Sequence, residues 1–143
     1  MEVLLWDVER MGTGIKIIDE QHKKLISIIN DLAIAIDKKE ENEILFEVVD
    51  RLIDYTQYHF KTEEDFFDQF DFEESSVHKS EHKYFIEHFK AIQKGLVKDA
   101  KKRDTSIIKL SEDILLYLVD WFILHITGSD RQYIDLFKQN GLS

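Results

Sequence analysis

The sequence contains no cysteine and no proline, and only 5 of its 143 residues are glycine. The absence of cysteine excludes disulfide bonds, thiolate zinc sites, iron–sulfur clusters and cysteine nucleophiles, so any metal must be held by histidine and carboxylate side chains. The scarcity of residues that break helices favours an all-α protein. The length fits one domain, and we expect residues 1–143 to form a single domain around one core.

Long apolar runs and an excess of positive charge are missing as well. No segment approaches the roughly 20 consecutive apolar residues of a membrane span. The N-terminal segment MEVLLWDVER lacks the basic region of a signal peptide, so we expect a cytoplasmic protein that does not enter a membrane. The 19 basic and 29 acidic residues give a formal net charge of −10, which disfavours nucleic acid as a partner. Solubility is a sufficient explanation of this acidity.

Apolar residues make up 43% of the sequence and recur at three- and four-residue steps, which predicts amphipathic helices. We expect an N-terminal arm over residues 1–18 and helices over about 19–38, 42–70, 75–100 and 105–127. Short polar segments join these helices, so they should pack as an antiparallel, up-down-up-down four-helix bundle. The predicted fold class is therefore all-α.

Histidine lies on the apolar stripe of every predicted helix. Two residues in neighbouring antiparallel helices stand at the same height when they are equidistant in sequence from the turn between them. The midpoint between His22 and His59 falls in the first predicted turn, that between His59 and His82 in the second, and that between His82 and His125 in the third. The four helices should therefore place histidine in one layer of the core.

Two further donors join this layer at helical spacing. Glu63 follows His59 by four residues and His78 precedes His82 by four, so each pair shares one helix face. Burying five imidazoles and a carboxylate without partners would destabilise the fold by several kcal/mol. Imidazole and carboxylate groups are metal ligands, and so many donors are too many for one ion and suit two ions with bridging carboxylates.

The seventh candidate donor is Asp130, whose spacing is irregular. It follows His125 by five residues, which is about 140° around a regular helix and off the shared face. Gly128 lies between the two residues. We predict that the helix widens by a π-type turn or ends near Gly128, and that this turns Asp130 inward.

A single histidine on an apolar stripe is more often a core or boundary residue than a ligand, so only the joint pattern predicts a metal site. His88 lies six residues beyond His82, about 9 Å along the helix axis and off its stripe. We expect His88 to be a surface residue with no role at the site.

Four segments of the sequence resemble the hemerythrin family, most closely its single-domain bacterial members. They are IDEQHK at 18–23, HFKTEE at 59–64, HKSEH at 78–82 and WFILHITGSD at 121–130, and together with Trp6 and residues 14–15 they span nearly the whole chain. Each short motif alone is weak evidence, whereas the four in this order and spacing are specific. The chain departs from the family at Phe67, where methionine is common, and at residues 72–73, where Tyr-Pro is common.

This resemblance implies a centre of two iron ions bridged by an oxo or hydroxo group. One iron would take His78, His82 and His125, and the other would take His22 and His59 and keep an open position for O2. Glu63 and Asp130 would bridge the two irons. The resemblance further implies that O2 is held as a hydroperoxide on one iron.

Five neutral imidazoles against two carboxylates favour reversible O2 binding over O–O cleavage, so we expect an O2-binding, carriage or storage protein rather than an enzyme. Two alternatives stay open: an O2- or redox-sensing module that acts through a protein partner, and an iron- or peroxide-handling di-iron enzyme with weak oxidase chemistry. We expect a monomer whose ligand is O2. His and carboxylate ligands also accept manganese and zinc, so the choice of iron rests on the resemblance.

Overall fold

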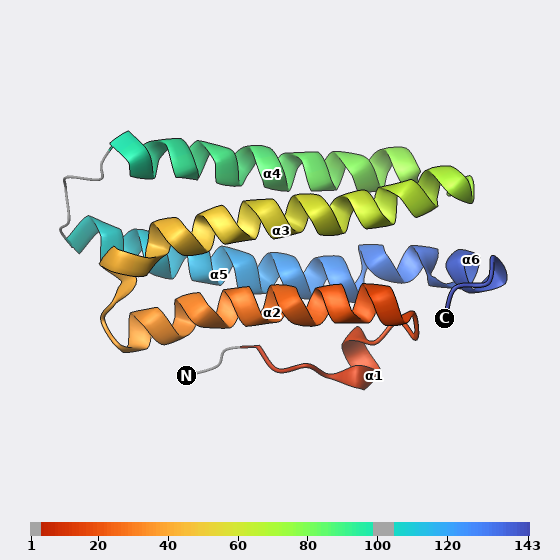
Figure 1. The fold of residues 1–143 in the computed structure, drawn as a ribbon, viewed down its shortest axis with the longest axis horizontal. Coiled ribbons are helices and arrows are strands. Elements are labelled where there is room, and N and C mark those ends of the chain that lie inside the picture. Colours follow the sequence, from red (N-terminus) through yellow and green to blue (C-terminus); the bar gives the residue numbers. More distant parts are fainter. Residues whose placement is uncertain (1–3, 99–104) are drawn as a thin grey trace.

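The computed structural model describes residues 4–98 and 105–143, and within these residues the regular secondary structure is entirely helical. Four long helices lie side by side and form a bundle (Figure 1). They are α2 (Lys16–Asp37), α3 (Glu41–Gln69), α4 (Ser75–Lys98) and α5 (Thr105–Thr127). Shorter elements flank the bundle: α1 (Val8–Met11) in the N-terminal arm, and the 3-10 helix η1 (Ser129–Tyr133) and α6 (Ile134–Gln139) after α5.

Successive long helices run in opposite directions, as the order of colours along the chain in Figure 1 shows. α2 packs against α3 and α5, and α3 packs against α4. The predicted antiparallel four-helix bundle is therefore confirmed. Residues 99–104, which include the last two residues of the predicted third helix, lie outside the described residues.

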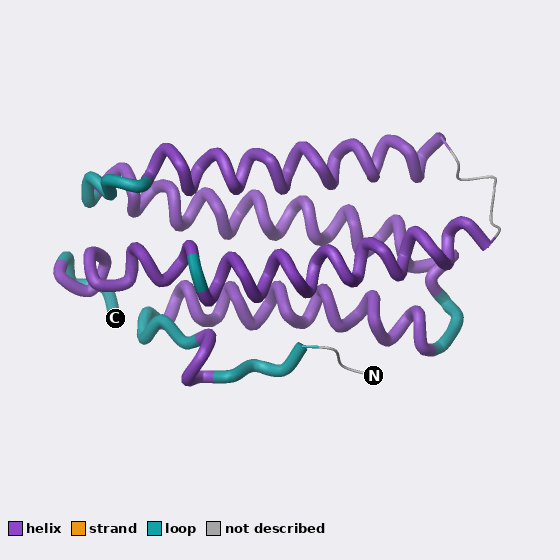
Figure 2. The backbone as a smooth tube through the Cα atoms, turned by 180° about the vertical axis from the view of Figure 1, so that it is seen from behind, coloured by secondary structure: helices purple, strands orange, loops and turns teal. Residues whose placement is uncertain are grey.

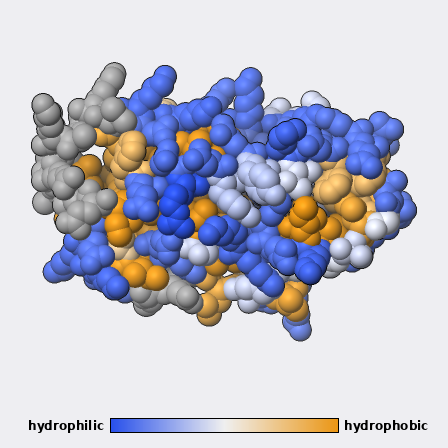
Figure 3. Space-filling model, in the orientation of Figure 1, coloured by the Kyte–Doolittle hydropathy of each residue, from blue (hydrophilic) through white to orange (hydrophobic). Residues whose placement is uncertain are grey.

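Buried apolar side chains form two clusters that the histidine layer separates. The larger fills the bundle and includes Leu25 and Phe60, whereas the smaller includes Ile18, Phe67 and Tyr133 at the end where α6 packs. The surface is largely polar on the face shown in Figure 3. The described chain holds no helix with the length and apolar character that crossing a membrane requires.

The N-terminal end of α2 differs from the sequence-based expectation. The helix begins at Lys16, three residues before the predicted start at residue 19. Asp19 lies in the first turn, where its carboxylate accepts hydrogen bonds of 2.8 Å from both the backbone N–H and the hydroxyl of Thr13. The Asp19 side chain thus binds the segment before the helix, and the helix extends back beyond it.

The N-terminal arm also differs from an irregular segment, because it contains the short helix α1. The arm lies along α2 (Figures 1 and 2). The Asn30 side chain accepts a hydrogen bond of 3.0 Å from the Leu4 backbone N–H and donates one of 2.8 Å to the Leu4 carbonyl. This paired contact attaches the start of the described chain to the bundle.

Candidate metal centre

The seven predicted donors lie together in one buried layer across the bundle, and none has more than 5% of its surface exposed. α2 supplies one, α3 and α4 supply two each, α5 supplies one and η1 supplies the last. They are His22, His59, Glu63, His78, His82, His125 and Asp130. The common height deduced from the turns is therefore present in the structure.

The donor atoms form two groups that share Asp130. One contains His78, His82, His125 and Asp130, and the other contains His22, His59, Glu63 and Asp130; within each group the donor atoms lie within 4.8 Å of one another. A metal ion with ligand distances of about 2.0–2.2 Å fits between atoms at this separation. The geometry thus offers two adjacent metal positions with a common carboxylate.

Asp130 reaches the layer because α5 ends at Thr127, which confirms the predicted end of the helix near Gly128. The chain then turns into the 3-10 helix η1, and Figure 2 shows the break as a short loop segment. A Cβ atom at Gly128 would lie 2.7 Å from the Leu124 carbonyl oxygen, a close approach that only glycine avoids. Oδ1 of Asp130 then lies 2.9 Å from Nε2 of His78 and 3.0 Å from Nε2 of His125.

A chain of hydrogen bonds fixes which ring nitrogen of His59 faces the centre. Thr62 donates its hydroxyl to the Tyr58 carbonyl, so its oxygen accepts from the Gln21 amide nitrogen at 3.2 Å. The Gln21 carbonyl oxygen therefore points at Nδ1 of His59, at 2.7 Å, and can only accept. His59 must donate from Nδ1, which leaves the Nε2 lone pair of the neutral ring for a metal.

Two other histidines of the layer face a carboxylate with their Nδ1 atoms. Oε2 of Glu64 lies 3.0 Å from Nδ1 of His82, and Oε2 of Glu81 lies 3.3 Å from Nδ1 of His125. A hydrogen bond from His125, with a second from Ser129, lowers the pKa of Glu81 to about 2. Both carboxylates are acceptors, so both histidines present Nε2 to the centre.

Without a cation, several polar atoms of the layer face one another unpaired. Nε2 of His59 lies only 2.7 Å from Oε1 of Glu63, yet neither atom has a hydrogen-bond partner among the described residues. Nε2 of His22 and Oδ2 of Asp130 are likewise without one, at a separation of 3.1 Å. Lone pairs that converge in this way require positive charge between them, so the residues present fit metal ions.

The charged groups of the layer shift one another's pKa values strongly. Burial opposes the charge on Asp130, but the neighbouring His125 outweighs it and lowers the pKa of the carboxyl well below its usual value. Burial also opposes the charge on His125, and Asp130 outweighs it and raises the pKa of this ring to about 10. Burial prevails at His82 and lowers its pKa to about 3. The Nε2 atoms of His82 and His125 lie 3.3 Å apart, so the pKa values of two neighbouring rings are shifted in opposite directions.

Aromatic rings pack directly on the imidazoles of the layer. Phe60 stacks on His82 with a centroid distance of 3.8 Å and an interplanar angle of 6°, and Trp121 stacks on His125 at 4.4 Å and 12°. Phe67, at a position where the family often has methionine, packs edge-on against His78 at 4.8 Å. These rings hold the imidazoles in place and keep water from their faces.

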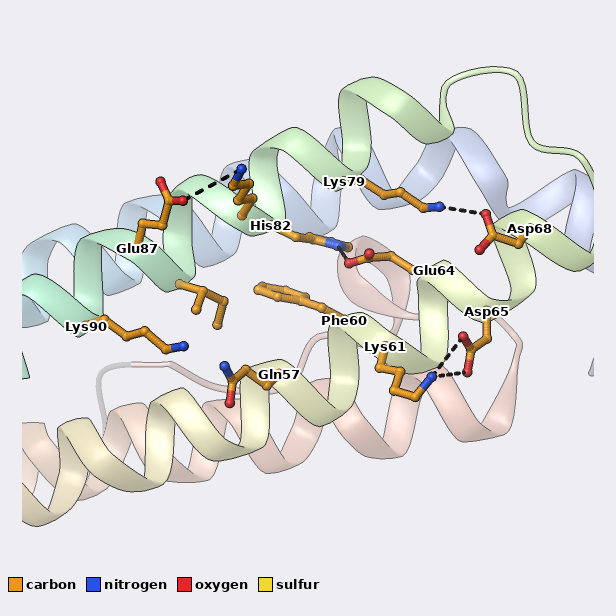
Figure 4. Close-up of a pocket in the computed structure, with 12 residues that line it drawn as sticks. Gln57, Phe60, Lys61, Glu64, Asp65, Asp68, Lys79, His82, Glu87 and Lys90 are labelled. Carbon is orange, nitrogen blue, oxygen red and sulfur yellow. Dashed lines mark hydrogen bonds and ion pairs between the residues drawn. The ribbon is translucent and has the colours of Figure 1, made fainter.

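A surface groove of about 660 Å³ between α3 and α4 reaches the edge of this layer (Figure 4). Phe60 and His82 line it, and Glu64 points from α3 toward His82. Ion pairs between Lys79 and Asp68 and between Lys61 and Asp65 stand at its rim.

His88 is remote from the layer: it is half-buried and packs against Tyr84 and Tyr117.

Sequence reasoning missed three residues of the described chain that hydrogen-bond to the predicted donors: Gln21, Glu64 and Glu81. A signal was present, because each directly adjoins a predicted donor in the sequence. Each one, however, binds a histidine of the following helix. Adjacency alone does not reveal such a contact, which depends on how the helices pack.

Known proteins resemble this chain over nearly its whole length. Residues 13–137 match the model of the Hemerythrin HHE cation binding domain. The chain is 31% identical to a bacteriohemerythrin of Pseudomonas aeruginosa (strain LESB58), over 98% of this chain and 85% of that protein. It is 27% identical to a bacteriohemerythrin of Methylococcus capsulatus, over 93% and 95% of the two chains. A crystal structure of wild-type hemerythrin superposes with a TM-score of 0.77 at 25% identity, covering 94% of this chain and 97% of that one.

Proposed function

Because this chain belongs to the hemerythrin family, we propose that it holds two iron ions in the buried histidine layer and binds O2 reversibly there. His78, His82 and His125 would hold one iron, and His22 and His59 would hold the other. Glu63 and Asp130 would bridge the pair. The division of the donor atoms into two groups that share Asp130 supports this assignment.

The observation that carries the proposal is the set of unpaired donor atoms that converge in the layer from α2, α3 and η1. The oxygens of Glu63 and the Nε2 atoms of His22 and His59 are buried and have no hydrogen-bond partner in the described chain. A bundle selected for stability alone would fill this layer with apolar side chains, because buried polar atoms without partners destabilise a fold.

The residues of the site favour binding over turnover. When bound, the iron pair supplies the two electrons that O2 takes up. The five neutral imidazoles donate less negative charge than a carboxylate-rich set, and so stabilise high-valent iron less. Leu25, Phe60 and Leu118 are buried and apolar, which would exclude water and limit the delivery of protons to O2 held there. We therefore propose O2 carriage or storage rather than catalysis.

The test is to load the protein with iron, reduce it without air, and add O2 while the visible absorption is followed. A charge-transfer band that appears with O2 and disappears on evacuation, over several cycles, supports reversible binding. Irreversible oxidation with release of peroxide would instead indicate the enzyme, and absence of about two irons per chain would overturn the proposal.

A second function, sensing, has one structural observation in its favour. Arg131 directly follows Asp130, and its guanidinium donates to the backbone carbonyls of Glu9 and Arg10 in the N-terminal arm. A movement of Asp130 on ligand binding would therefore reach α1. Hydrogen exchange of the arm in the reduced and O2-bound protein tests this: a change in protection that Arg131→Gln abolishes supports sensing, and equal protection contradicts it.

A further inference from the structure

Three residues beside the ligands form a directional arrangement around the bundle. Gln21 on α2 binds a histidine of α3, Glu64 on α3 binds one of α4, and Glu81 on α4 binds one of α5. Each helix thus orients the ligand of the helix that follows it in the chain. We call Gln21, Glu64 and Glu81 the orienting residues.

We propose that the orienting residues make the two metal positions unequal, so that the position of His82 and His125 retains its metal more tightly and stabilises its higher oxidation state more than the position of His22 and His59. This inference rests on the proposed di-iron site. It assigns a positioning role to three side chains that do not contact the metals.

The inequality follows from the charge of the partners. A carboxylate that accepts the Nδ1–H of a ligand histidine makes the ring more electron-rich and a stronger donor, and a neutral amide does so less. His82 and His125 both bind a carboxylate, whereas His59 binds the neutral Gln21. Nδ1 of His22 is buried and lacks a hydrogen-bond partner in the described part of the chain.

Burial explains why the charge is distributed in this way. Side chains of Glu64 and Glu81 are 30% and 40% exposed, so each carboxylate keeps contact with water while it binds a buried ring. Gln21 is only 5% exposed, where an additional carboxylate would be poorly solvated. Gln21 compensates through geometry, because its bond to Thr62 prevents its amide from turning and presenting a donor to His59.

Isosteric exchanges test the inference directly, since glutamate and glutamine differ in charge and hardly in shape. Glu64→Gln and Glu81→Gln remove charge from one half of the site, and Gln21→Glu adds charge to the other. Glu87→Gln is the control, because Glu87 is on α4 but is exposed, and its ion pair within the described residues is a long one of 3.9 Å with Lys83.

Zn²⁺-loaded protein is challenged with a chelator, and the rates of the two phases of metal release are measured. In the wild type we expect one ion to leave before the other. Glu64→Gln and Glu81→Gln should accelerate the slow phase by about 10–100-fold, and Gln21→Glu should slow the fast phase by about tenfold. In iron-loaded protein the reduction potential should rise in the first two variants and fall in Gln21→Glu.

If the orienting residues only maintained the structure, every exchange would disturb the site and shift the release rates and the reduction potential in the same direction. Opposite shifts in Gln21→Glu and in the two glutamate variants therefore point to the charge of the side chain. The inference is overturned if the first two variants behave like Glu87→Gln, or if all three exchanges shift the potential in one direction. Protein that binds two Zn²⁺ and shows these shifts but does not bind O2 reversibly would overturn only the proposed function. Protein that retains neither Zn²⁺ nor iron would overturn both.

Discussion

Oδ2 of Asp130 lies 3.1 Å from Nε2 of His22, although one residue is in η1 near the end of the chain and the other is in the first long helix. The second oxygen of the same carboxylate contacts His78 and His125. A single side chain from outside the four long helices thus touches both halves of the candidate centre.

Asp130→Asn should abolish retention of both metals, because the amide nitrogen replaces a carboxylate oxygen that the two donor groups share. The loss of affinity should exceed the roughly 10–100-fold that the loss of a hydrogen-bond partner of a ligand causes. The iron content after gel filtration measures the effect. Asp135→Asn, at an exposed position five residues later, is the matched control and should keep the wild-type iron content.

Gly128→Ala should displace η1, because the added Cβ would lie 2.7 Å from the Leu124 carbonyl oxygen. We expect destabilisation by about 1–3 kcal/mol, as for other overpacked positions, together with a loss of iron that exceeds the loss of helical signal. Denaturant unfolding and iron content measure the two effects.

Gly95→Ala is the control for this substitution. It lies in α4, and apart from its chain neighbours and the helix's own backbone no described atom stands within 4 Å of the added Cβ, so alanine should stabilise the helix by about 0.5–1 kcal/mol and leave iron content unchanged. Equal effects of the two substitutions would contradict the role given to Gly128.

His78→Ala should remove the rise in Tm that iron produces in the wild-type protein, because a ligand that binds only the folded state stabilises it. His88→Ala should preserve this rise, since His88 packs on Tyr84 and Tyr117 away from the layer. Thermal unfolding of each variant with and without iron provides the comparison, and a lost rise in His88→Ala would be evidence against the assignment.

Iron retention should weaken as the pH falls. A metal binds neutral imidazole, whereas the neighbouring Asp130 raises the pKa of the metal-free His125 ring to about 10, so a proton competes with the metal for this ring and acid favours the metal-free form. Metal loss should therefore come before unfolding of the bundle as the pH decreases. Visible absorption and far-ultraviolet circular dichroism, followed in the same titration, separate the two events; coincident transitions would show that the metal is required for the fold itself.

The bundle and the height of the histidine layer could be predicted from the sequence because both follow from periodicity and from distances to the turns. The inward position of Asp130 was predicted from Gly128 and from the failure of regular helical spacing. The start of α2 was placed too late, because the helix extends back beyond Asp19, which binds Thr13 from inside the first turn. Such a side chain–backbone contact depends on the path of the preceding segment.

The orienting residues were beyond sequence reasoning for a different reason. Glutamate beside a ligand occurs on most acidic helix surfaces, and nothing in the sequence separates Glu64 from its exposed neighbour Asp65. Only the packing of α3 on α4 brings Glu64 to His82. Helical periodicity places residues on a face, but it does not give the rotation of that face relative to the next helix.

The most direct measurement of the central claim is a cycle of O2 addition and evacuation on the reduced, iron-loaded protein, followed by its charge-transfer absorption. We expect about two irons per chain and a band that forms with O2 and vanishes when O2 is removed, with little loss of amplitude between cycles. Stable binding of fewer than two irons, or a band that persists after evacuation, would contradict it.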